Sequence, residues 1–434
     1  MDKMADVLGR AGAWCGQNKY LSAIKNAFQN FMPLTIAGAI GVLWCNVLVN
    51  DQTGLGLFFK PIMALDFLNP AFQAVNFCTI SCITVGITLG IAQEIGVWNM
   101  GAERAGYIPG LVGLAAWLSV TNTSHMVDGA KEAFTGIAGN ELGATGLFTG
   151  MIIGVLSVEL FCFFEKQDAL KIKMPEQVPP GVARAFEVLV PATITLIITA
   201  CIGSACYNLT GLYLNDVIKN GVQGPLGAVG ATVPGVMIIY LVIMLFWLVG
   251  IHGNNMLSAV KEALFTPLAL ENVEAFNKGE TPKNIINMYA LQMWGEFGGS
   301  GVTIGLVIAI MIFGKREDNK AIATLSLVPG LFNINETVTF GIPMVLNPIL
   351  GIPFVVAPLV TIIIGYVLTV IGFCPVACLT VPWTTPPLVF GFLATGANIM
   401  GAVTQAILIV VSTVIYVPFL ISYEKYQNKQ AAEA

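Results

Sequence analysis

The chain has 434 residues, of which 56% are hydrophobic and only 10% are charged, and its formal net charge is −5. A soluble globular chain carries about 25% charged residues, so this composition predicts an all-α polytopic membrane protein. The sequence has no basic patch of the kind that binds nucleic acid, which argues against that class of partner.

The first half of the chain predicts a surface segment followed by five spans. Residues 1–30 are amphipathic and are expected to lie on the cytoplasmic membrane surface, and they lack the pattern of a cleaved signal peptide. Apolar stretches predict spans at 31–49, 71–92, 107–120, 146–164 and 186–207. The loop 165–184 is the densest basic loop of this half, so the positive-inside rule places it in the cytoplasm. The Gly-rich segment 208–230 connects the two halves.

The predicted helices of the second half are interrupted more often than those of the first half. Strong spans are predicted at 233–251, 353–373 and 400–421, whereas 301–313 is short for a crossing and 321–335 is too interrupted for a simple span. Prolines in 381–392 exclude an unbroken helix there. The whole pattern predicts about ten transmembrane helices plus re-entrant hairpins and amphipathic interfacial helices. The polar tail carries Lys425 and Lys429, which favours a cytoplasmic C-terminus.

One carboxylate stands out in this second half. Glu336 is the only Asp, Glu, Lys, Arg or His between Ala321 and Tyr423. An acidic side chain at membrane depth costs about 2.5–3.5 kcal/mol on insertion scales, so it needs a partner, a proton or a water-filled cavity. Pro329 and Pro343 interrupt regular helix on either side of it. The pattern favours a polar-substrate site, and a helix end at the membrane interface is the alternative.

Four polar segments that break regular helix lie in the second half, at 252–255, 298–301, 333–336 and 383–385. Transporter sites are built from such interrupted helices near the bilayer midplane. Their carboxylate, amide, imidazole and hydroxyl groups supply the donors and acceptors that sugar hydroxyls need, and an indole ring packs on the apolar face of a sugar. Taken singly, these segments also suit a helix end, a hinge or an interfacial anchor. Together they predict a sugar site with the candidate binding residues Asn254, Asn255, Trp294, Gly299, Ser300, Asn333, Asn335, Trp383 and Thr384.

Several functions are excluded by what the sequence lacks. It has no G-x-x-x-x-G-K-[ST] motif, so no nucleotide hydrolysis is expected. His125 and His252 are the only histidines, which leaves no multi-histidine metal site. The nine cysteines form no C-x-x-C pair. Neither a metal nor a cofactor is therefore expected.

The motifs P-P-G-V-A-R-A-F, G-I-H-G-N-N, G-G-S-G, N-I-N-E and F-G-I-P follow one another along the chain. They carry a resemblance that covers nearly the whole chain, and their order makes it specific. With them the sequence resembles the membrane-embedded IIC component of the bacterial phosphoenolpyruvate-dependent sugar phosphotransferase system, in its lactose/cellobiose/diacetylchitobiose branch. Thr337 departs from the pattern, because relatives often have proline after the glutamate. The resemblance implies a multi-pass protein of the bacterial cytoplasmic membrane that forms a homodimer. Residues 1–230 would form its dimerisation scaffold, and residues 231–434 would bind and transport the sugar.

The resemblance also implies a reaction. A separate IIB protein, charged through IIA and the general phosphocarriers, carries a phosphocysteine, and the 6-hydroxyl of a β-linked disaccharide attacks its phosphorus. Glu336 would hold this hydroxyl and accept its proton, and His252 would donate a hydrogen bond nearby. Whether the chain is itself an enzyme stays open, because the phosphoryl donor is another polypeptide. Diacetylchitobiose and cellobiose are the favoured sugars, and lactose is the third candidate.

Two other functions remain as alternatives. The first is a proton- or cation-coupled sugar symporter that uses Glu336 as its coupling group, which would accumulate unmodified sugar. The second is a membrane receptor that transports nothing. The spacing of charges does not separate these functions from group translocation, and only the resemblance favours the latter.

Overall fold

A computed structural model of the chain describes residues 10, 14, 17–51, 55–125, 134–175, 177–342, 344–345 and 347–433. Pro343 and most of the expected surface segment before residue 17 lie outside these residues. Helices make up most of the described chain, which confirms the all-α class. Its only strands are β1 (Ser124–His125) and β2 (Phe134–Thr135), which pair antiparallel.

Six described helical stretches are long and apolar enough to cross a membrane, and they confirm a multi-pass membrane protein. These are Lys19–Leu48, Lys60–Met100, Ala144–Glu165, Pro180–Thr210, Gly351–Val370 and Ile399–Glu433. Three shorter apolar helices accompany them at Ile108–Val120, Val233–Leu248 and Ile304–Phe313. Helix length and composition do not decide which of the shorter helices cross, so the count of ten spans stays a prediction.

The chain divides into two compact units by its internal packing. One unit consists of Met1–Gly16, Ala39–Pro70 and Ala228–Ala434, and the other of Gln17–Gly38 and Ala71–Gly227. Two of the boundaries between these ranges fall within the helices α2 (Lys19–Leu43) and α3 (Asn69–Cys78). The division into halves at 1–230 and 231–434, and their separate roles in dimerisation and sugar binding, stay predictions.

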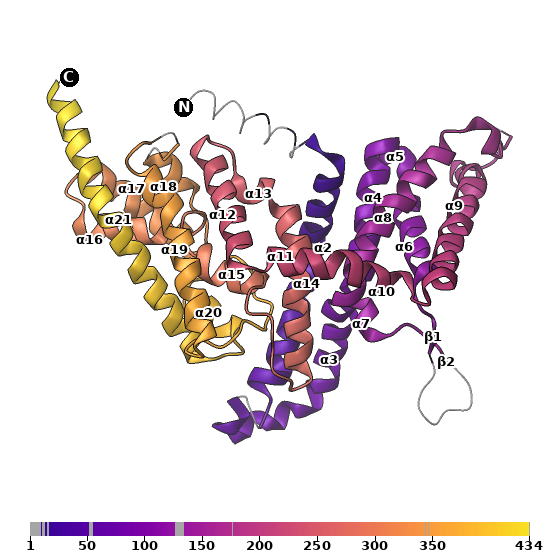
Figure 1. Cartoon of the computed structure of the whole chain (residues 1–434), viewed down its shortest axis with the longest axis horizontal. Helices are drawn as coiled ribbons and strands as arrows, with labels where there is room; N and C mark the ends of the chain where they lie inside the picture. The colour runs from indigo at the N-terminus through magenta and orange to yellow at the C-terminus, as the bar shows by residue number, and fades with distance from the viewer. Residues whose placement is uncertain are drawn as a thin grey trace. The chain divides into compact units, whose positions relative to one another are not determined.

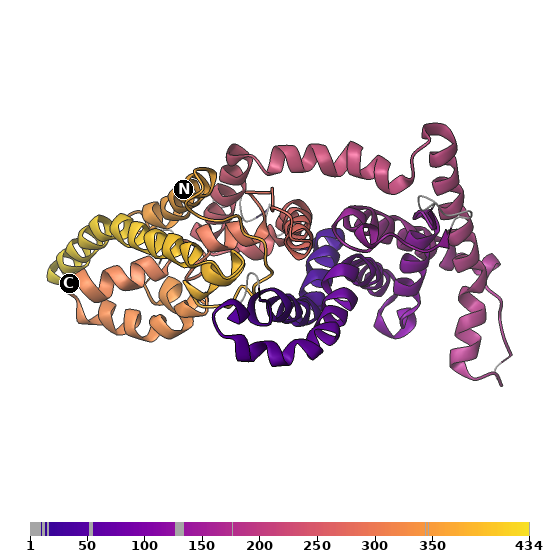
Figure 2. The same ribbon diagram turned by 90° about the horizontal axis from the view of Figure 1, so that it is seen from below.

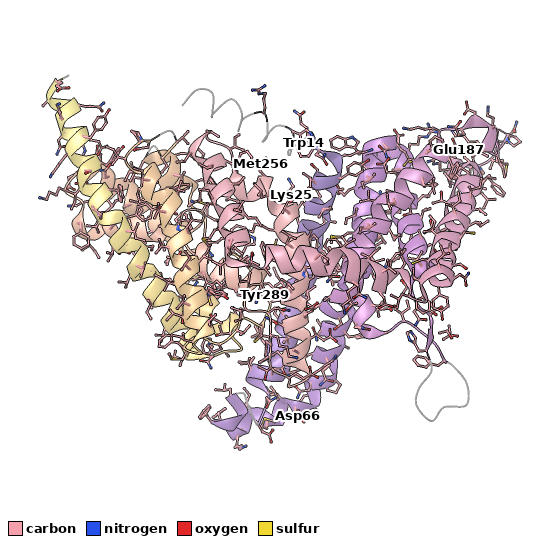
Figure 3. All side chains as sticks on the ribbon, in the orientation of Figure 1. Trp14, Lys25, Asp66, Glu187, Met256 and Tyr289 are labelled. Atoms are coloured by element: carbon pink, nitrogen blue, oxygen red, sulfur yellow. The ribbon has the colours of Figure 1, made fainter. Side chains whose placement is uncertain are left out.

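The unit that contains 71–227 is a bundle of closely packed helices. In it α4 (Ile83–Met100), α6 (Ile108–Val120) and α8 (Ala144–Glu165) pack against one another, and α9 (Pro180–Thr210) packs on α6 and α8 (Figure 1). The buried Trp117 of α6 packs with Ile153 of α8. Glu187 lies near the start of α9 (Figure 3), where it accepts a hydrogen bond from Arg184 at 2.9 Å.

Short elements connect these helices. They are the π-helical turns η1 (Trp44–Leu48) and η6 (Lys219–Gln223), the 3₁₀ turns η2 (Leu55–Leu57), η3 (Lys60–Leu68), η4 (Ile80–Cys82) and η5 (Asp168–Leu170), and the helices α5 (Ala102–Ala105), α7 (Gly139–Leu142), α10 (Leu214–Ile218) and α11 (Gly224–Gly230).

The unit that contains 228–434 is built from interrupted helices. It holds α12 (Val233–Leu248), α13 (Gly253–Met256), α14 (Ser258–Asn277), α15 (Met288–Gly295), α16 (Ile304–Phe313), α17 (Glu317–Leu331), α18 (Glu336–Gly341), α19 (Gly351–Val370), α20 (Val389–Ala394) and α21 (Ile399–Glu433). The long helix α21, drawn in yellow, runs beside α16 and α19 (Figures 1 and 2). The chain between α19 and α20 is not helical, which confirms the break predicted at 381–392.

The helix boundaries differ from those predicted at several places, and two of them change the interpretation of a segment. The expected surface segment ending at residue 30 and the first span form one helix from Lys19, because no glycine separates them and Pro33 does not stop the helix. Residues 317–331 form the continuous helix α17, although 321–335 was expected to be interrupted. Pro329 falls in the last turn of α17, where it removes a single backbone donor and few hydrogen bonds depend on it.

Candidate functional site

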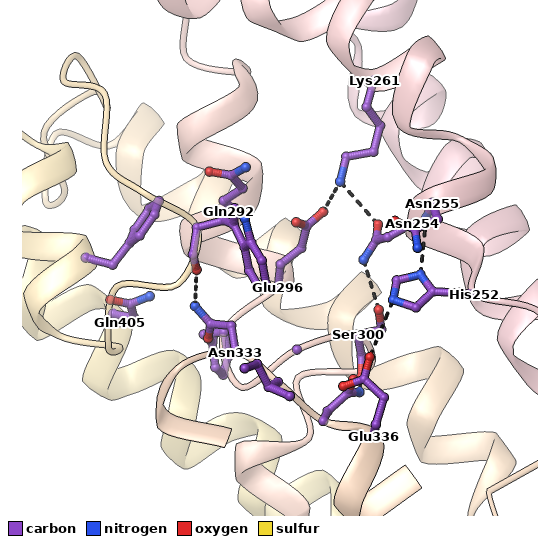
Figure 4. A pocket seen from close by; sticks show the side chains of 16 residues that line it. His252, Asn254, Asn255, Lys261, Gln292, Glu296, Ser300, Asn333, Glu336 and Gln405 are labelled. Carbon is purple, nitrogen blue, oxygen red and sulfur yellow. Dashed lines mark hydrogen bonds and ion pairs between the residues drawn. The ribbon is translucent and has the colours of Figure 1, made fainter. Parts of the chain in front are cut away.

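A cavity of about 570 Å³ lies within the unit that contains 228–434. Its walls come from α13, α14, α15, α18, α20, α21 and the breaks between them (Figure 4). It is lined by His252, Asn254, Asn255, Lys261, Gln292, Glu296, Phe297, Gly299, Ser300, Asn333, Ile334, Asn335, Glu336, Trp383, Phe390 and Gln405. Its volume lies within the range of small-molecule sites, and the mixture of amides, carboxylates and aromatic rings suits a polar ligand with an apolar face.

Glu336 and His252 meet at one side of this cavity (Figure 4). The Nε2 atom of His252 lies 3.9 Å from Oε1 of Glu336. The Nδ1 atom of His252 accepts a hydrogen bond from the backbone N–H of Asn255 at 3.2 Å and thereby caps α13. Because Nδ1 is an acceptor, the proton of the neutral ring is assigned to Nε2, on the side of the carboxylate. Burial lowers the pKa of His252, against the opposing effect of the Glu336 charge.

Glu336 is the first residue of α18, where free backbone N–H groups favour a negative charge. Its side chain is 48% exposed. Because α18 begins at the cavity wall, the Glu336 side chain reaches the cavity. A carboxylate in a water-accessible cavity is one of the solutions that its position in an apolar sequence requires.

The Gly-rich turn after α15 is shaped to approach the Glu336 segment. Gly298 and Gly299 have φ values of +71° and +86°, in the region that favours glycine. A Cβ atom on Gly299 would lie 2.6 Å from Cγ of Asn335. Asn333 also has a positive φ, which asparagine tolerates, and its Oδ1 accepts a hydrogen bond from the Gly298 N–H at 2.6 Å. These residues bring two of the predicted broken segments into direct contact.

Asn333 reaches the fourth broken segment as well. Its Nδ2 donates hydrogen bonds to the backbone carbonyls of Trp383 and of Thr385, the latter at 3.2 Å. Trp383 itself is 44% exposed and lines the cavity. Its ring is therefore open to a ligand while its backbone is fixed.

A chain of hydrogen bonds connects the remaining predicted amides. Asn335 donates from Nδ2 to the carbonyl of Ser300 at 2.7 Å, and Asn254 donates from Nδ2 to the Ser300 hydroxyl at 2.9 Å. Lys261 donates from Nζ to Oδ1 of Asn254 at 3.2 Å. The amides of Asn254, Asn333 and Asn335 thus hold the protein together, and this leaves fewer of their groups for a ligand than the sequence implied.

Nine of the predicted site residues line this one cavity: His252, Asn254, Asn255, Gly299, Ser300, Asn333, Asn335, Glu336 and Trp383. Trp294 and Thr384 do not line it. Trp294 is 1% exposed and packs on α19, where a Cβ atom on Gly365 would lie 2.4 Å from its indole ring. A sugar contact by either residue stays a prediction that this geometry does not support.

Seven lining residues were not among those predicted: Lys261, Gln292, Glu296, Phe297, Ile334, Phe390 and Gln405. Glu296 lies two residues before the Gly-rich turn, and a carboxylate near a predicted helix break is a signal that could have identified it. Gln292 lies one turn earlier on α15. Gln405 lies in the first part of the span predicted at 400–421, with no neighbouring motif, so only the tertiary structure reveals its place.

Comparison with known proteins identifies the family. Residues 25–358 match the family model described as "Phosphotransferase system, EIIC". The chain is 32% identical to the oligo-β-mannoside-specific EIIC component of Bacillus subtilis (strain 168), covering 98% of this chain and 94% of that protein. It is 30% identical to the cellobiose-specific EIIC component of Lactococcus lactis subsp. lactis (strain IL1403), covering 98% of each.

Further relatives agree. The lactose-specific EIICB component of Streptococcus mutans serotype c is 32% identical, over 96% of this chain and 71% of that protein. The crystal structure of ChbC, the IIC component of the N,N′-diacetylchitobiose-specific phosphotransferase system, superposes with a TM-score of 0.88 at 30% identity and covers 97% of both chains. The chain therefore belongs to the EIIC family of the phosphotransferase system and is a sugar permease of a bacterial membrane.

Proposed function

We propose that this permease takes up a β-linked disaccharide and presents its 6-hydroxyl to the phosphocysteine of a IIB partner, with diacetylchitobiose or cellobiose as the favoured sugar. One observation carries the proposal: Glu336 and His252 lie together on the wall of a cavity that also exposes the indole of Trp383. An acceptor, a donor and a stacking surface are the three elements that recognition of a sugar hydroxyl and of the ring behind it requires.

The reaction proceeds by transfer of one proton and one phosphoryl group. Glu336 accepts the proton from the 6-hydroxyl while this oxygen attacks the phosphorus of the phosphocysteine. The new O–P bond forms as the S–P bond breaks, and the cysteine leaves as a thiolate. His252 donates from Nε2 to the same sugar oxygen and fixes its position. Phosphoryl transfer depends mostly on such positioning and on the management of charge.

The choice of sugar rests on the relatives. Their names include oligo-β-mannoside, cellobiose, lactose and N,N′-diacetylchitobiose as substrates. These sugars share two β-linked rings as the minimum unit, and the cavity of about 570 Å³ has the size of a small-molecule site. The lactose relatives are EIICB proteins, which supports a IIB partner for this chain. A homodimer, with IIA and the general phosphocarriers upstream, completes the proposed system.

Reconstitution tests the proposal against the symporter. Purified protein in liposomes is given labelled diacetylchitobiose, cellobiose or lactose, with or without phosphorylated IIB inside. We expect sugar phosphate inside only when phosphorylated IIB is present, and no effect of an uncoupler. Accumulation of unmodified sugar that collapses with the uncoupler would instead establish the symporter. A panel of the same sugars, titrated by calorimetry, identifies the preferred substrate.

A further inference from the structure

Glu296 is a second carboxylate on the wall of the same cavity, and its two oxygens have different surroundings (Figure 4). Its Oε1 accepts a hydrogen bond from the Tyr240 hydroxyl at 2.6 Å and another from Lys261 Nζ. Its Oε2 accepts no hydrogen bond from the described part of the chain. The side chain is 17% exposed, so this free oxygen belongs to a group that a ligand in the cavity can reach.

Glu296 forms an ion pair with Lys261 of α14. Lys261 is the only lysine or arginine among the described residues that line the cavity, and its side chain is 7% exposed. A buried ammonium and a buried carboxylate offset much of each other's desolvation when they are paired and hydrogen-bonded. Tyr240 is fully buried and approaches from α12. Groups from α12 and α14 therefore hold one oxygen of Glu296 in a fixed position.

The hydrogen-bond chain described above connects this carboxylate to the segment that carries Glu336. It runs from Lys261 through Asn254 to the hydroxyl of Ser300, whose carbonyl accepts from Asn335. Asn335 directly precedes Glu336. The two carboxylates thus belong to one polar framework, and a rigid ligand can be held at both.

We propose that Glu296 is a second sugar-binding residue, whose Oε2 accepts a hydrogen bond from a hydroxyl or amide N–H of the disaccharide other than the 6-hydroxyl. This inference rests on the proposed function and adds to it a determinant of specificity. A free carboxylate oxygen offers only an acceptor, so it selects a substrate group that donates. Glu296 binds and positions the sugar, and the proton of the reacting hydroxyl goes to Glu336.

The main alternative is that Lys261 and Glu296 only join α14 to α15. Removing one member of a buried ion pair destabilises a protein in either case, so single substitutions do not separate the two roles. The double variant Lys261→Met/Glu296→Leu separates the two roles, because it leaves no unpaired charge in the protein interior. A joining role predicts normal sugar binding in the double variant, whereas a sugar-binding role predicts its loss.

The experiment combines these variants with modified sugars. Calorimetry measures binding of the preferred disaccharide, and of a set of analogues that each lack one donor group, to the native protein, Glu296→Gln and the double variant. We expect one analogue to bind the native protein about 10- to 100-fold more weakly than the parent sugar, as loss of a hydrogen bond to a charged group implies. In Glu296→Gln the same analogue and the parent sugar should bind within about threefold of each other. The double variant should fold with a lower melting temperature, because Tyr240 and Asn254 lose their partners, and it should lose about 10-fold or more in affinity.

A matched control comes from the other ion pair of α14, between Lys278 and Glu274, which lies off the cavity. In Glu274→Gln, each analogue should lose the same affinity relative to the parent sugar as it does in the native protein. The inference is overturned if every analogue keeps its native loss of affinity, relative to the parent sugar, in Glu296→Gln. It is also overturned if the double variant binds the parent sugar normally. Failure of the native protein to bind any β-linked disaccharide would instead overturn the proposed function, and this inference with it.

Discussion

In the proposed reaction, Glu336 and His252 have complementary capacities at the reacting hydroxyl. Glu336 supplies only acceptor oxygens, and it lies at a helix start that stabilises its charge. His252 offers Nε2–H as a donor, because its other nitrogen already accepts the backbone N–H of Asn255. A hydroxyl between them can donate to the carboxylate and accept from the imidazole. This arrangement orients the oxygen before the phosphoryl group arrives.

Replacing Glu336 separates sugar binding from phosphorylation. In Glu336→Gln the amide keeps the shape of the side chain and can still accept a hydrogen bond, but it takes up no proton. We expect sugar affinity within about tenfold of the native value and loss of sugar-phosphate formation in the presence of phosphorylated IIB. Calorimetry and a phosphorylation assay measure the two quantities. Normal sugar-phosphate production by this variant would refute the role of Glu336 as the base.

The protonation of His252 provides a test by nuclear magnetic resonance. Because burial lowers its pKa, we expect a titration midpoint below the ordinary value of about 6.5, with the neutral ring protonated at Nε2. The neutral ring then stabilises the folded protein above about pH 6.5, and this contribution is lost as the pH falls through the lowered pKa. Nitrogen spectra of histidine-labelled protein report both the midpoint and the tautomer. His125 is the only other histidine, so His252→Gln assigns the signals. An Nδ1-protonated ring would contradict the assignment.

Substitution of Trp383 tests whether a sugar ring stacks on its indole. Trp383 is 44% exposed and lines the cavity, while its carbonyl is held by Asn333. If a sugar ring packs on the indole, Trp383→Ala should weaken sugar binding by about 1–3 kcal/mol, with little change in melting temperature because the ring is not part of the core. Calorimetry on the two proteins measures the difference. Equal affinities would assign Trp383 to the membrane interface instead.

At the scale of elements, the site depends on hydrogen bonds between segments that are not helical. The chain before α20 enters it with Leu388 at a φ of +73°, a conformation that leucine seldom adopts. Gln405 of α21 holds this entry: its Oε1 accepts the N–H groups of Leu388 at 2.7 Å and of Gly391 at 2.9 Å. Its Nε2 donates to the carbonyl of Met293 in α15 at 3.3 Å. One amide thus joins three elements around the cavity.

Removal of this amide should loosen the cavity wall. In Gln405→Met two N–H groups lose their acceptor, and each buried unsatisfied group costs about 1–3 kcal/mol. We expect a lower melting temperature together with weaker sugar binding. Thr413→Val is the control on the same helix, because Thr413 donates only to the Ile409 carbonyl of its own turn. If Gln405→Met and Thr413→Val behave alike, Gln405 does not hold the site.

The sequence predicts the broken elements better than their junctions. Glycines and prolines mark where helices stop, so the four polar segments could be located from local chemistry. The bond from Asn333 to the Trp383 carbonyl joins residues fifty positions apart in sequence, and no local pattern indicates it. The sequence analysis did not predict Glu296 as a site residue for a related reason. It lies outside the charge-free stretch that made Glu336 conspicuous, and its pairing with Lys261 depends on how α14 meets α15.

At the scale of the whole molecule, phosphoryl transfer requires access from one side of the membrane. In the proposed reaction the phosphocysteine belongs to a cytoplasmic IIB protein. The reacting hydroxyl would then be reached from the cytoplasm, and the orientation of the spans would be part of the mechanism. Helix α8 has 22 residues, or about 33 Å at 1.5 Å per residue, which matches the hydrocarbon core. We therefore expect the loops at its two ends to lie on opposite sides of the bilayer.

The positive-inside rule predicts which side is which. The loop after α8 carries Lys166, Lys171 and Lys173, so we expect it in the cytoplasm, with the segment before α8 outside. Single cysteines at Gln167 and Asn140, in a protein whose native cysteines are replaced by alanine and whose sugar binding is retained, distinguish the two loops in intact cells. A membrane-impermeant maleimide should label Asn140→Cys directly and Gln167→Cys only after permeabilisation. A third cysteine at Gln430, in the tail with Lys425 and Lys429, should behave as Gln167→Cys does if the C-terminus is cytoplasmic. The reverse pattern at residues 140 and 167 would invert the first half and would exclude a cytoplasmic basic loop.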